Sequence, residues 1–461
     1  MKISRDDALA AAGGEAFDVA ALPAFWEFST DSRTLQPGQV FVALRGATFD
    51  GHAFVPEALA RGAAALVVDD RSALPEGTPA LAVRDTTLAL LAFGGVARAQ
   101  SRAKVVAITG SAGKTTTKAL LAQLLEHTGF GTVAATVANE NNEIGVAKLL
   151  LGVPGDAAAI VAELGARHFG EIETLVRAVR PDVGILTNVG DAHLEIMGSP
   201  ERLAETKWGL FATGAQAVLN LDDATSRARA AGLRPNPEWF GARERVPDEQ
   251  LPGGRETLIV GRRRLVVRGP SGVASFAVDC RLAGAHNLSN LAAAAAGALA
   301  LGVPPEQVAA AAGELALPAG RYERLRIGEI ELIYDAYNAS MSGTLATLGS
   351  FALESGGRRI AVLGGMAELG PQAAAMHERV GAAAAECGLA LLLLGGEFAN
   401  DFERGARAAG FPPERLLTFR ANGEAIALLR ERARPGDLVL LKGSRKYKLE
   451  EIREGLRAVY A

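Results

Sequence analysis

The stretch VVAITGSAGKTTTK at residues 105–118 decides the fold of this chain. Its apolar start predicts a buried parallel strand, and a helical pattern begins near Thr115. Between them, Gly110 and Gly113 allow backbone N–H groups to turn inward at a helix N-terminus, where the helix dipole favours an anion. Lys114 can then reach the outer phosphates of a nucleotide. The stretch therefore predicts a phosphate-binding loop between a strand and a helix.

This loop is shorter than the general P-loop, which has four residues between its two glycines. Only Ser111 and Ala112 separate the two glycines here, and Ile108 stands where the first glycine of the general pattern would be. The alternative interpretation is an ordinary strand-to-helix turn with a chance lysine and threonine. Gly-Lys-Thr-Thr-Thr directly after an apolar strand makes that the weaker interpretation.

The totals exclude several classes of protein. A length of 461 residues predicts two to four domains, and 48 basic against 52 acidic side chains give a net charge of −4, without the excess of positive charge that a nucleic-acid polymer needs. No apolar run reaches about 18 residues and the N-terminus lacks a signal-peptide core, so we expect a soluble, cytoplasmic protein. Cys280 and Cys387 have no ligand-like spacing, so we expect buried, reduced side chains.

Apolar strands alternate with helical segments after residue 100, at 160–162, 183–186 and 217–220. This pattern predicts a doubly wound parallel sheet, in which ligands bind at the carboxyl ends of the strands. Glu163 directly follows the first of these strands and His193 follows the second. Each could be an ordinary strand-end acid or loop histidine, but their place beside the phosphate loop favours metal or phosphate chemistry.

Three domains follow from the boundaries: a small α/β domain at 1–100, a central nucleotide-binding domain at 101–317 and an α/β domain at 318–461. Short alternating strands at 235–278 predict an antiparallel excursion from the central sheet. Asn287 precedes a long alanine-rich helix, and we expect it either to cap that helix or to contact a base or sugar.

The motifs together resemble the Mur ligase family over essentially the whole chain. The resemblance rests on the shortened phosphate loop and on these motifs: Asp31-Ser32-Arg33, Phe49-Asp50-Gly51-His52, Asn139 to Gly145, Glu163-Leu164-Gly165-Ala166, Thr187 to Glu195, His286-Asn287 with Asn290, Gly320-Arg321, Asp335 to Ala339, and Lys442 to Arg445. They look most like the branch of the family that adds D-alanyl-D-alanine in peptidoglycan synthesis.

The resemblance implies an ATP-dependent ligase that joins D-Ala-D-Ala to UDP-MurNAc-tripeptide through an acyl phosphate, acting as a monomer. It implies a UDP-sugar domain, a central ATPase sheet and a Rossmann-like C-terminal domain that closes over the nucleotide and binds the incoming amine. It also implies two Mg²⁺ sites and a carbamylated Lys207, although without the resemblance Lys207 looks like a lysine on a helix surface.

The resemblance also implies the roles of individual residues. Those implied for ATP are Gly110, Ser111, Ala112, Gly113, Lys114, Thr115, Thr116, Asn287, Asn290, Arg321 and Asp335. Those implied for the metal ions are Thr115, Glu163, His193 and Lys207, the last three acting in catalysis with Lys114. Those implied for the substrates are Asp31, Ser32, Arg33, Asp50, Gly51, His52, Asn139, Asn141, Asn142, Asn188, Tyr337 and Asn338.

Three departures from the family pattern lie in the C-terminal domain. Ser340 to Gly343 replace an Asn-Pro pair, so we expect a flexible turn there. Gly365 stands where the family usually has an acid, and Lys446-Tyr447 replace a common Gly-Met pair. These changes keep open a Mur-type ligase with another acceptor. A nucleotide switch without ligase activity is a weaker alternative.

Overall fold

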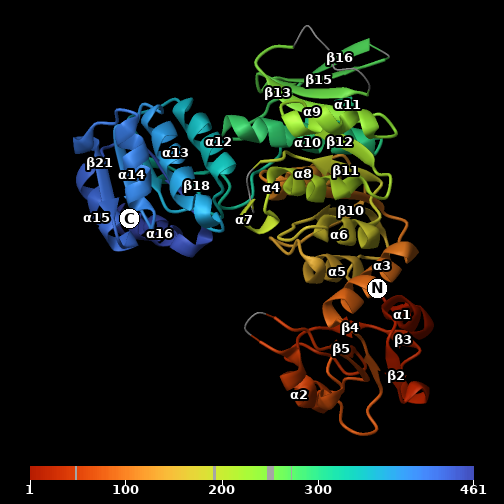
Figure 1. Ribbon diagram of the computed structural model, residues 1–461. Coiled ribbons are helices and arrows are strands. Elements are labelled where there is room, and N and C mark those ends of the chain that lie inside the picture. The colour runs from red at the N-terminus through yellow and green to blue at the C-terminus, as the bar shows by residue number, and fades with distance from the viewer. Residues whose placement is uncertain (47–48, 191–193, 247–253, 271, 461) are drawn as a thin grey trace.

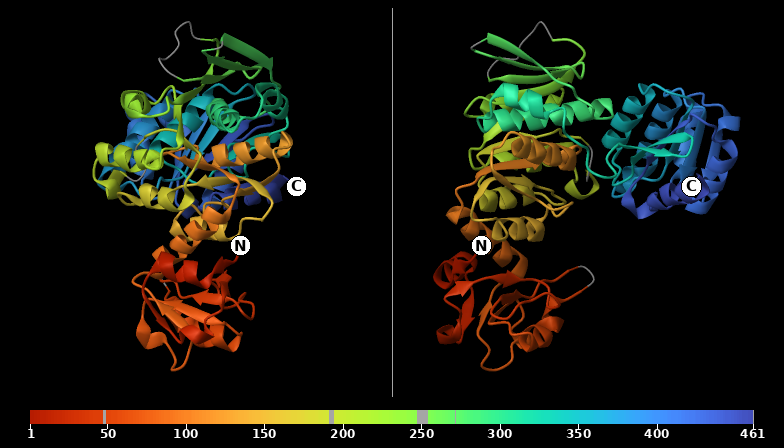
Figure 2. Two further views of the ribbon diagram at one scale, coloured as in Figure 1. Left: turned by 90° about the vertical axis from the view of Figure 1, so that its right-hand side faces the viewer. Right: turned by 180° about the vertical axis from the view of Figure 1, so that it is seen from behind.

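The structure, a computed structural model, describes residues 1–46, 49–190, 194–246, 254–270 and 272–460, and the side chains of residues 194, 195 and 460 are not described. Three bodies follow one another along the chain (Figure 1). The central body lies above the N-terminal one, and the C-terminal body lies beside the central one, as the rear view in Figure 2 also shows. No helix in these ranges is long and apolar enough to cross a membrane.

The N-terminal body is built on a five-stranded sheet with the order β2-β7-β6-β5-β4, in which only β2 is antiparallel. Its strands are β2 (Glu15–Phe17), β4 (Phe28–Ser29), β5 (Val40–Val42), β6 (Ala65–Val68) and β7 (Ala80–Ala82), with β1 (Ile3–Ser4) and β3 (Phe25–Trp26) as a separate pair. Its helices are α1 (Arg5–Ala12), α2 (Val55–Ala60) and α3 (Thr86–Gln100).

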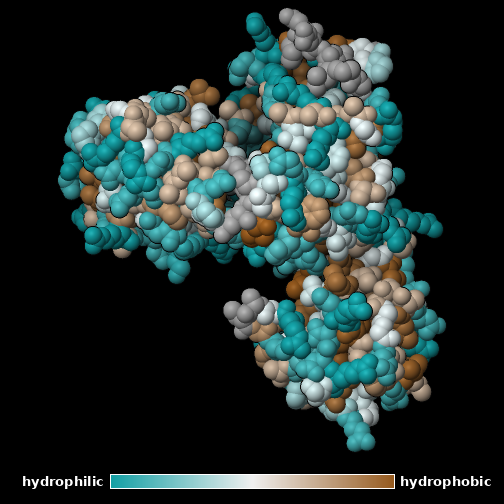
Figure 3. Space-filling view, viewed as in Figure 1, coloured by the Kyte–Doolittle hydropathy of each residue, from teal (hydrophilic) through white to brown (hydrophobic). Residues whose placement is uncertain are grey.

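Helix α3 connects this body to the central one, because it packs against α5 and α6 of the central sheet. One apolar core runs through the junction, from Trp26 and Phe93 to Val105 and Ile160. Hydrophobic residues also gather on the surface where the two bodies meet (Figure 3). The predicted boundary near residue 100 falls at the end of α3.

The central body holds a nine-stranded sheet with the order β16-β15-β14-β13-β12-β11-β8-β10-β9. Its strands are β8 (Lys104–Thr109), β9 (Thr132–Ala135), β10 (Ala157–Glu163), β11 (Val183–Leu186), β12 (Gln216–Asn220), β13 (Glu238–Arg243), β14 (Glu256–Val260), β15 (Arg264–Gly269) and β16 (Gly272–Ala277). Its helices are α4 (Lys114–His127), α5 (Glu143–Leu151), α6 (Glu171–Val179), α7 (Leu194–Met197), α8 (Pro200–Trp208), α9 (Ala224–Arg229), α10 (Ala285–Ala300) and α11 (Pro305–Ala311).

Helices cover both faces of this sheet, which confirms the doubly wound prediction. Helices α4, α10 and α11 bury one face, and α3, α5 and α6 bury the other. The alanines at 292–296 of α10 are at most 1% exposed, and their short side chains allow the helix to lie close to the strands. Strands β8, β10 and β11 are parallel, so Thr109, Glu163 and Leu186 end at one edge of the sheet.

One expectation for this body is wrong in part, and one of the two alternatives for Asn287 is excluded. The segment after residue 235 is not an antiparallel excursion throughout, because β13 pairs parallel with both β12 and β14, and only β15 and β16 are antiparallel. Asn287 does not cap α10, because Gly284 holds the N-cap position and the Asn287 amide donates to the carbonyl of Ala283 at 2.9 Å.

The C-terminal body has a six-stranded sheet with the order β17-β18-β22-β19-β20-β21, parallel except for β17. Its strands are β17 (Glu323–Ile327), β18 (Ile330–Asp335), β19 (Arg359–Leu363), β20 (Leu391–Gly395), β21 (Leu416–Phe419) and β22 (Leu438–Lys442). Helices α12 (Met341–Ala352), α13 (Ala373–Ala385) and α14 (Ala399–Ala408) bury one face, and α15 (Asn422–Arg432) and α16 (Glu450–Tyr460) bury the other.

The expected flexible turn at residues 340–343 coincides with the start of α12. Ser340 is the N-cap of α12, and its hydroxyl accepts a hydrogen bond from the backbone N–H of Gly343 at 3.2 Å. A serine cap stabilises the start of a helix by satisfying an otherwise free backbone donor, whereas a proline acts by fixing φ. Both cysteines are free and buried, as expected.

Candidate active site

A cavity of about 1040 Å³ lies between the central and C-terminal bodies. It gathers eighteen of the residues that the sequence singled out: Ser111, Ala112, Gly113, Lys114, Thr115, Thr116, Asn139, Asn141, Asn142, Glu163, Asn188, Lys207, Asn287, Asn290, Arg321, Asp335, Tyr337 and Asn338. Gly110 lies outside the lining, although its carbonyl accepts from the Lys114 ammonium at 2.7 Å. His193 lies outside the described residues.

The phosphate loop is held in shape by the chain that follows β11. The side-chain amide of Asn188 pairs with the backbone of Ala112 in both directions, at 3.0 and 3.1 Å. Gly113 has a φ of +84°, and a Cβ there would lie 2.4 Å from Oδ1 of Asn290. The loop therefore needs glycine at this position, and Asn188 fixes the loop geometry.

Glu163, at the end of β10, is the buried carboxylate of the site, with 1% of its surface exposed. Its Oε1 accepts from the Thr115 hydroxyl at 3.2 Å and from the Asn141 amide at 2.8 Å. Its Oε2 lies 3.3 Å from the Lys118 ammonium but has no hydrogen bond in the described part of the chain. Sequence reasoning did not assign Lys118 to the site, although it lies one helical turn after Lys114.

Lys207 is not a surface residue, because it is only 2% exposed. It lies in α8 and has no carboxylate or hydrogen-bond partner among the described residues that line the cavity. Burial lowers its pKa well below the usual lysine value, and the nearby charge of Lys114 lowers it further. Burial likewise lowers the pKa of Lys114, which Glu163 partly offsets.

The C-terminal body closes the other wall of the cavity. The Arg321 guanidinium donates to the Thr115 hydroxyl at 3.3 Å and lies 4.2 Å from the centre of the Tyr337 ring. Asp335 lies at the end of β18 and is buried against the Lys442 ammonium at 3.0 Å. Lys442 ends the neighbouring strand β22, which explains how residues so distant in sequence meet.

Two asparagines of α10 lie against the phosphate loop. The Asn290 amide donates to Oδ1 of Asn287 at 2.9 Å, and Oδ1 of Asn290 accepts from Thr117 of α4 at 3.5 Å. His286 precedes them, and burial lowers its pKa to about 4, so the ring is neutral at physiological pH. This end of the cavity therefore offers amide groups rather than charge.

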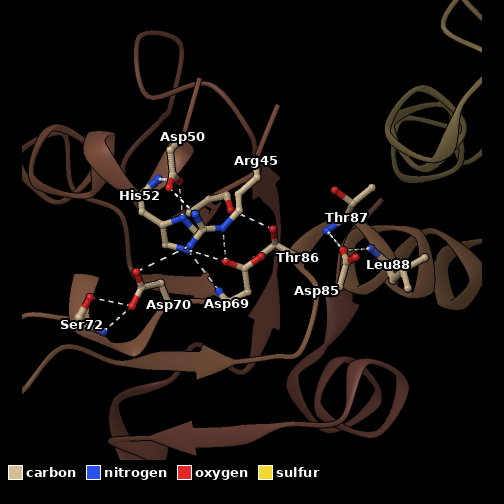
Figure 4. Close-up of polar contacts among 11 residues, drawn as sticks. Arg45, Asp50, His52, Asp69, Asp70, Ser72, Asp85, Thr86, Thr87 and Leu88 are labelled. Atoms are coloured by element: carbon tan, nitrogen blue, oxygen red, sulfur yellow. Dashed lines mark hydrogen bonds and ion pairs between the residues drawn. The ribbon is translucent and has the colours of Figure 1, made fainter. Parts of the chain in front are cut away.

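The N-terminal motifs do not line this cavity; they lie within the N-terminal body. Asp50, His52 and Arg45 form one network, with Asp50 Oδ1 2.6 Å from His52 Nδ1 and Arg45 Nε donating to Asp69 at 2.8 Å (Figure 4). Because His52 Nε2 accepts from the backbone N–H of Asp69, Nδ1 carries the proton that His52 donates to Asp50. Gly51 lies between Asp50 and His52 in the chain, and a Cβ there would be 2.6 Å from the Leu44 carbonyl oxygen.

The first motif, Asp31-Ser32-Arg33, is a second local network. Arg33 donates two hydrogen bonds to the Asp31 carboxylate, at 2.9 and 2.7 Å, and these lower the pKa of Asp31 to about 2. The Ser32 hydroxyl donates to Glu57 at 2.9 Å. The structure thus gives both N-terminal motifs a local folding role, and it does not bring them to the phosphate loop.

Metal ligands are few among the described residues. No group of three or more His, Cys, Asp and Glu side chains gathers there as a ligand set. Glu163 and the Thr115 hydroxyl are nevertheless adjacent oxygen donors beside a phosphate loop, and oxygen donors are what Mg²⁺ prefers. A carbamate on Lys207 would provide further oxygen donors, in addition to those of Glu163 and Thr115.

Three family models match the chain. The Mur ligase middle domain matches residues 108–298, the Mur ligase glutamate ligase domain matches 320–445, and the Mur ligase family catalytic domain matches 27–169. The chain is 37% identical to the UDP-N-acetylmuramoyl-tripeptide–D-alanyl-D-alanine ligase of Synechocystis sp., over 90% of this chain and 88% of that one. It is 32% identical to the Escherichia coli protein of the same name, over 93% of each chain.

Solved structures agree in fold. MurF from Acinetobacter baumannii superposes with a TM-score of 0.85 at 27% identity, covering 99% of each chain. MurF from Thermotoga maritima, solved in complex with ADP, has a TM-score of 0.78 at 25% identity, covering 96% of this chain and 98% of that one. With a phosphate loop, a buried strand-end glutamate and a closing C-terminal sheet all in place, the chain belongs to the Mur ligase family.

Proposed function

We propose that this chain is an ATP-dependent ligase that joins D-alanyl-D-alanine to UDP-MurNAc-tripeptide in the synthesis of peptidoglycan precursors. The observation that carries the proposal is the single cavity in which the phosphate loop, Glu163 and Lys207 face Arg321 and Asp335 of the C-terminal body. Relatives at 31–37% identity over most of the chain carry the name of this ligase.

ATP would bind with its phosphates on the loop and its base toward α10. Lys114 and Arg321 supply positive charge at the outer phosphates, and the amides of Asn287 and Asn290 lie at the end suited to the base and sugar. The Thermotoga maritima relative was solved in complex with ADP, which supports nucleotide binding by this chain.

The residues present fit a divalent cation and a carbamate. Glu163 Oε1 and the Thr115 hydroxyl are 3.2 Å apart beside the loop, and His193 and carbamylated Lys207 would complete the ligands. Burial lowers the pKa of Lys207, which favours the neutral amine, the form that reacts with CO₂. Bound Mg²⁺ would screen the repulsion between a substrate carboxylate and the γ-phosphate, and the carbamate would provide an anionic ligand.

The chemistry has two steps. A carboxylate oxygen of the tripeptide attacks the γ-phosphorus, and the bond from the γ-phosphorus to the bridging oxygen of the β-phosphate breaks. ADP departs, and the tripeptide becomes an acyl phosphate. The free amine of D-Ala-D-Ala then attacks the acyl carbon, loses a proton, and expels phosphate. Lys114 and Arg321 stabilise the negative charge of the transferring phosphoryl group, because both line the cavity that would hold it.

Water must be kept from the acyl phosphate, which would otherwise hydrolyse. Arg321 of the C-terminal body already reaches Thr115 of the central body, so closure of these two bodies forms the wall that excludes water. The N-terminal body, residues 1–100, would hold the UDP-sugar through its Asp31 and Asp50 motifs, at the far end of a long substrate. We expect a monomer acting in the cytoplasm.

A different acceptor is the second candidate, and one observation favours it. Tyr447 lies over Gly365, so that a Cβ at 365 would be 2.3 Å from the Tyr447 hydroxyl oxygen. The usual acid of the family is thus replaced by a glycine that an aromatic ring covers, in the C-terminal body to which the resemblance assigns the incoming amine. Phosphate release from ATP, measured with UDP-MurNAc-tripeptide and a panel of amines, distinguishes the two candidates.

A further inference from the structure

Lys118 is a buried lysine that the mechanism above does not use. It lies in α4, one turn after Lys114, and is 5% exposed. Its ammonium donates to the carbonyls of Thr136 and Ala138, at 2.7 Å each, and lies 3.3 Å from Oε2 of Glu163. Its three N–H groups therefore have three oxygen atoms to face.

These contacts join three segments of the central body. Lys118 belongs to the phosphate helix, Glu163 ends β10, and residues 136–138 lead into the loop that carries Asn141. The Thr136 hydroxyl also accepts from the backbone N–H of Glu163 at 2.9 Å. Ala138 has a φ of +44°, a conformation that a non-glycine residue adopts only when its surroundings hold it.

The contacts also divide the two carboxylate oxygens of Glu163 between different partners. Oε2 faces the Lys118 ammonium, whereas Oε1 faces Thr115 and Asn141. The ion pair between Oε2 and the buried Lys118 ammonium opposes rotation of the carboxylate about its last torsion, although Oε2 accepts no hydrogen bond among the described residues. Oε1 is therefore kept on the side of the phosphate loop.

We propose that Lys118 is a positioning residue for the nucleotide site. By holding Oε2 of Glu163 and the loop at 136–138, it keeps Oε1 directed toward Thr115, where a divalent cation would bind together with ATP or ADP. This inference rests on the proposed nucleotide-dependent function, and it assigns Lys118 no contact with substrate.

The test measures ADP binding by calorimetry, with excess Mg²⁺ and with EDTA, in the wild type and in Lys118→Met. Residues that orient a metal ligand typically change metal affinity by about 10-fold to 100-fold. We expect Lys118→Met to weaken ADP binding by about 10-fold or more in Mg²⁺, and by less than about 2-fold in EDTA. A residue that only stabilises the fold would change both affinities alike.

Lys104→Met is the matched control. Lys104 also pairs with a carboxylate of the central body, Asp182 at 3.4 Å, but that pair is exposed and remote from the loop. We expect it to leave both ADP affinities within about 2-fold of the wild type.

Glu163→Gln shows whether Lys118 acts through Glu163. Once the carboxylate is gone, adding Lys118→Met should change ADP binding in Mg²⁺ by less than about 2-fold. If Lys118→Met alone fails to fold because it leaves a buried charge unpaired, Lys118→Arg, which keeps the charge but changes the shape of the donor, takes its place in the comparison of Mg²⁺ with EDTA, with a loss of ADP affinity again expected in Mg²⁺ alone.

Three results would overturn the inference: equal losses of affinity in Mg²⁺ and in EDTA, an unchanged response to Mg²⁺, or a further 10-fold loss in the Glu163→Gln background. A wild-type protein that does not bind ADP in Mg²⁺ at all would instead overturn the proposed function, and the inference with it.

Discussion

Replacing Gly365 with aspartate restores the acid that the family usually has, and the structure predicts that this chain will not tolerate it. The new Cβ would lie 2.3 Å from the hydroxyl oxygen and 2.4 Å from Cζ of Tyr447. The ring cannot easily move, because it lies over Gly396, and its hydroxyl donates to Glu397 at 3.2 Å. Forcing extra atoms into such a space costs about 1–3 kcal/mol.

Thermal unfolding measures this loss of stability, as a decrease in Tm of roughly 2–4 °C per kcal/mol for a domain of this size. Tyr447→Met removes the ring and restores the residue type common in the family, so Gly365→Asp should be less destabilising in that background by about 1 kcal/mol or more. Gly423→Asp is the control, since a Cβ at that position meets no atom within 4 Å. Additive effects of the two substitutions, or a fully stable Gly365→Asp protein, would refute the packing argument.

Three further predictions concern the cavity. Gly113→Ala should weaken ADP binding by about 10-fold, since a left-handed φ and Oδ1 of Asn290 at 2.4 Å both oppose the new Cβ. In calorimetry the same substitution should cost less affinity when made in an Asn290→Ala background, where the Oδ1 atom is gone. Lys207→Met should abolish phosphate release, and wild-type protein stripped of CO₂ should regain activity with bicarbonate; activity indifferent to bicarbonate would contradict carbamylation. Burial lowers the pKa of His286 to about 4, so the free energy of unfolding should decrease by up to about 3 kcal/mol as the pH falls from 6.5 toward 4. In urea unfolding, His286→Gln should reduce that decrease, and an equal decrease in the variant would contradict the prediction.

The strands and the phosphate loop could be predicted from the sequence, because their signals are local. The apolar run before Gly110 could only be a buried strand, and the register of β8, β10 and β11 then brought Glu163 to the loop. The same rule, that parallel strands end at one edge, explains why Asp335 and Lys442 meet.

The errors came from contacts between distant residues. Whether β13 runs parallel or antiparallel depends on its partner strands, which its own alternating pattern does not identify. Lys207 looked like a surface residue, because α8 carries few apolar residues and the wall that buries it comes from elsewhere in the chain. Lys118 was part of the quoted stretch, but its partner Glu163 is 45 residues away, and only the fold joins them.

The replaced Asn-Pro pair is a further place where residue types alone were not enough. Residue types alone suggested a flexible turn at 340–343, whereas the structure shows that Ser340 caps α12 there. Without the proline ring, the start of α12 is stabilised in another way, by the hydrogen bond of the Ser340 hydroxyl.

The most direct test of the central claim is phosphate release from ATP with UDP-MurNAc-tripeptide, with and without D-Ala-D-Ala, followed by mass spectrometry of the product. The account predicts release that requires both substrates, and a product whose mass is that of UDP-MurNAc-pentapeptide. Release with no amide product, or no release with any amine, would contradict it.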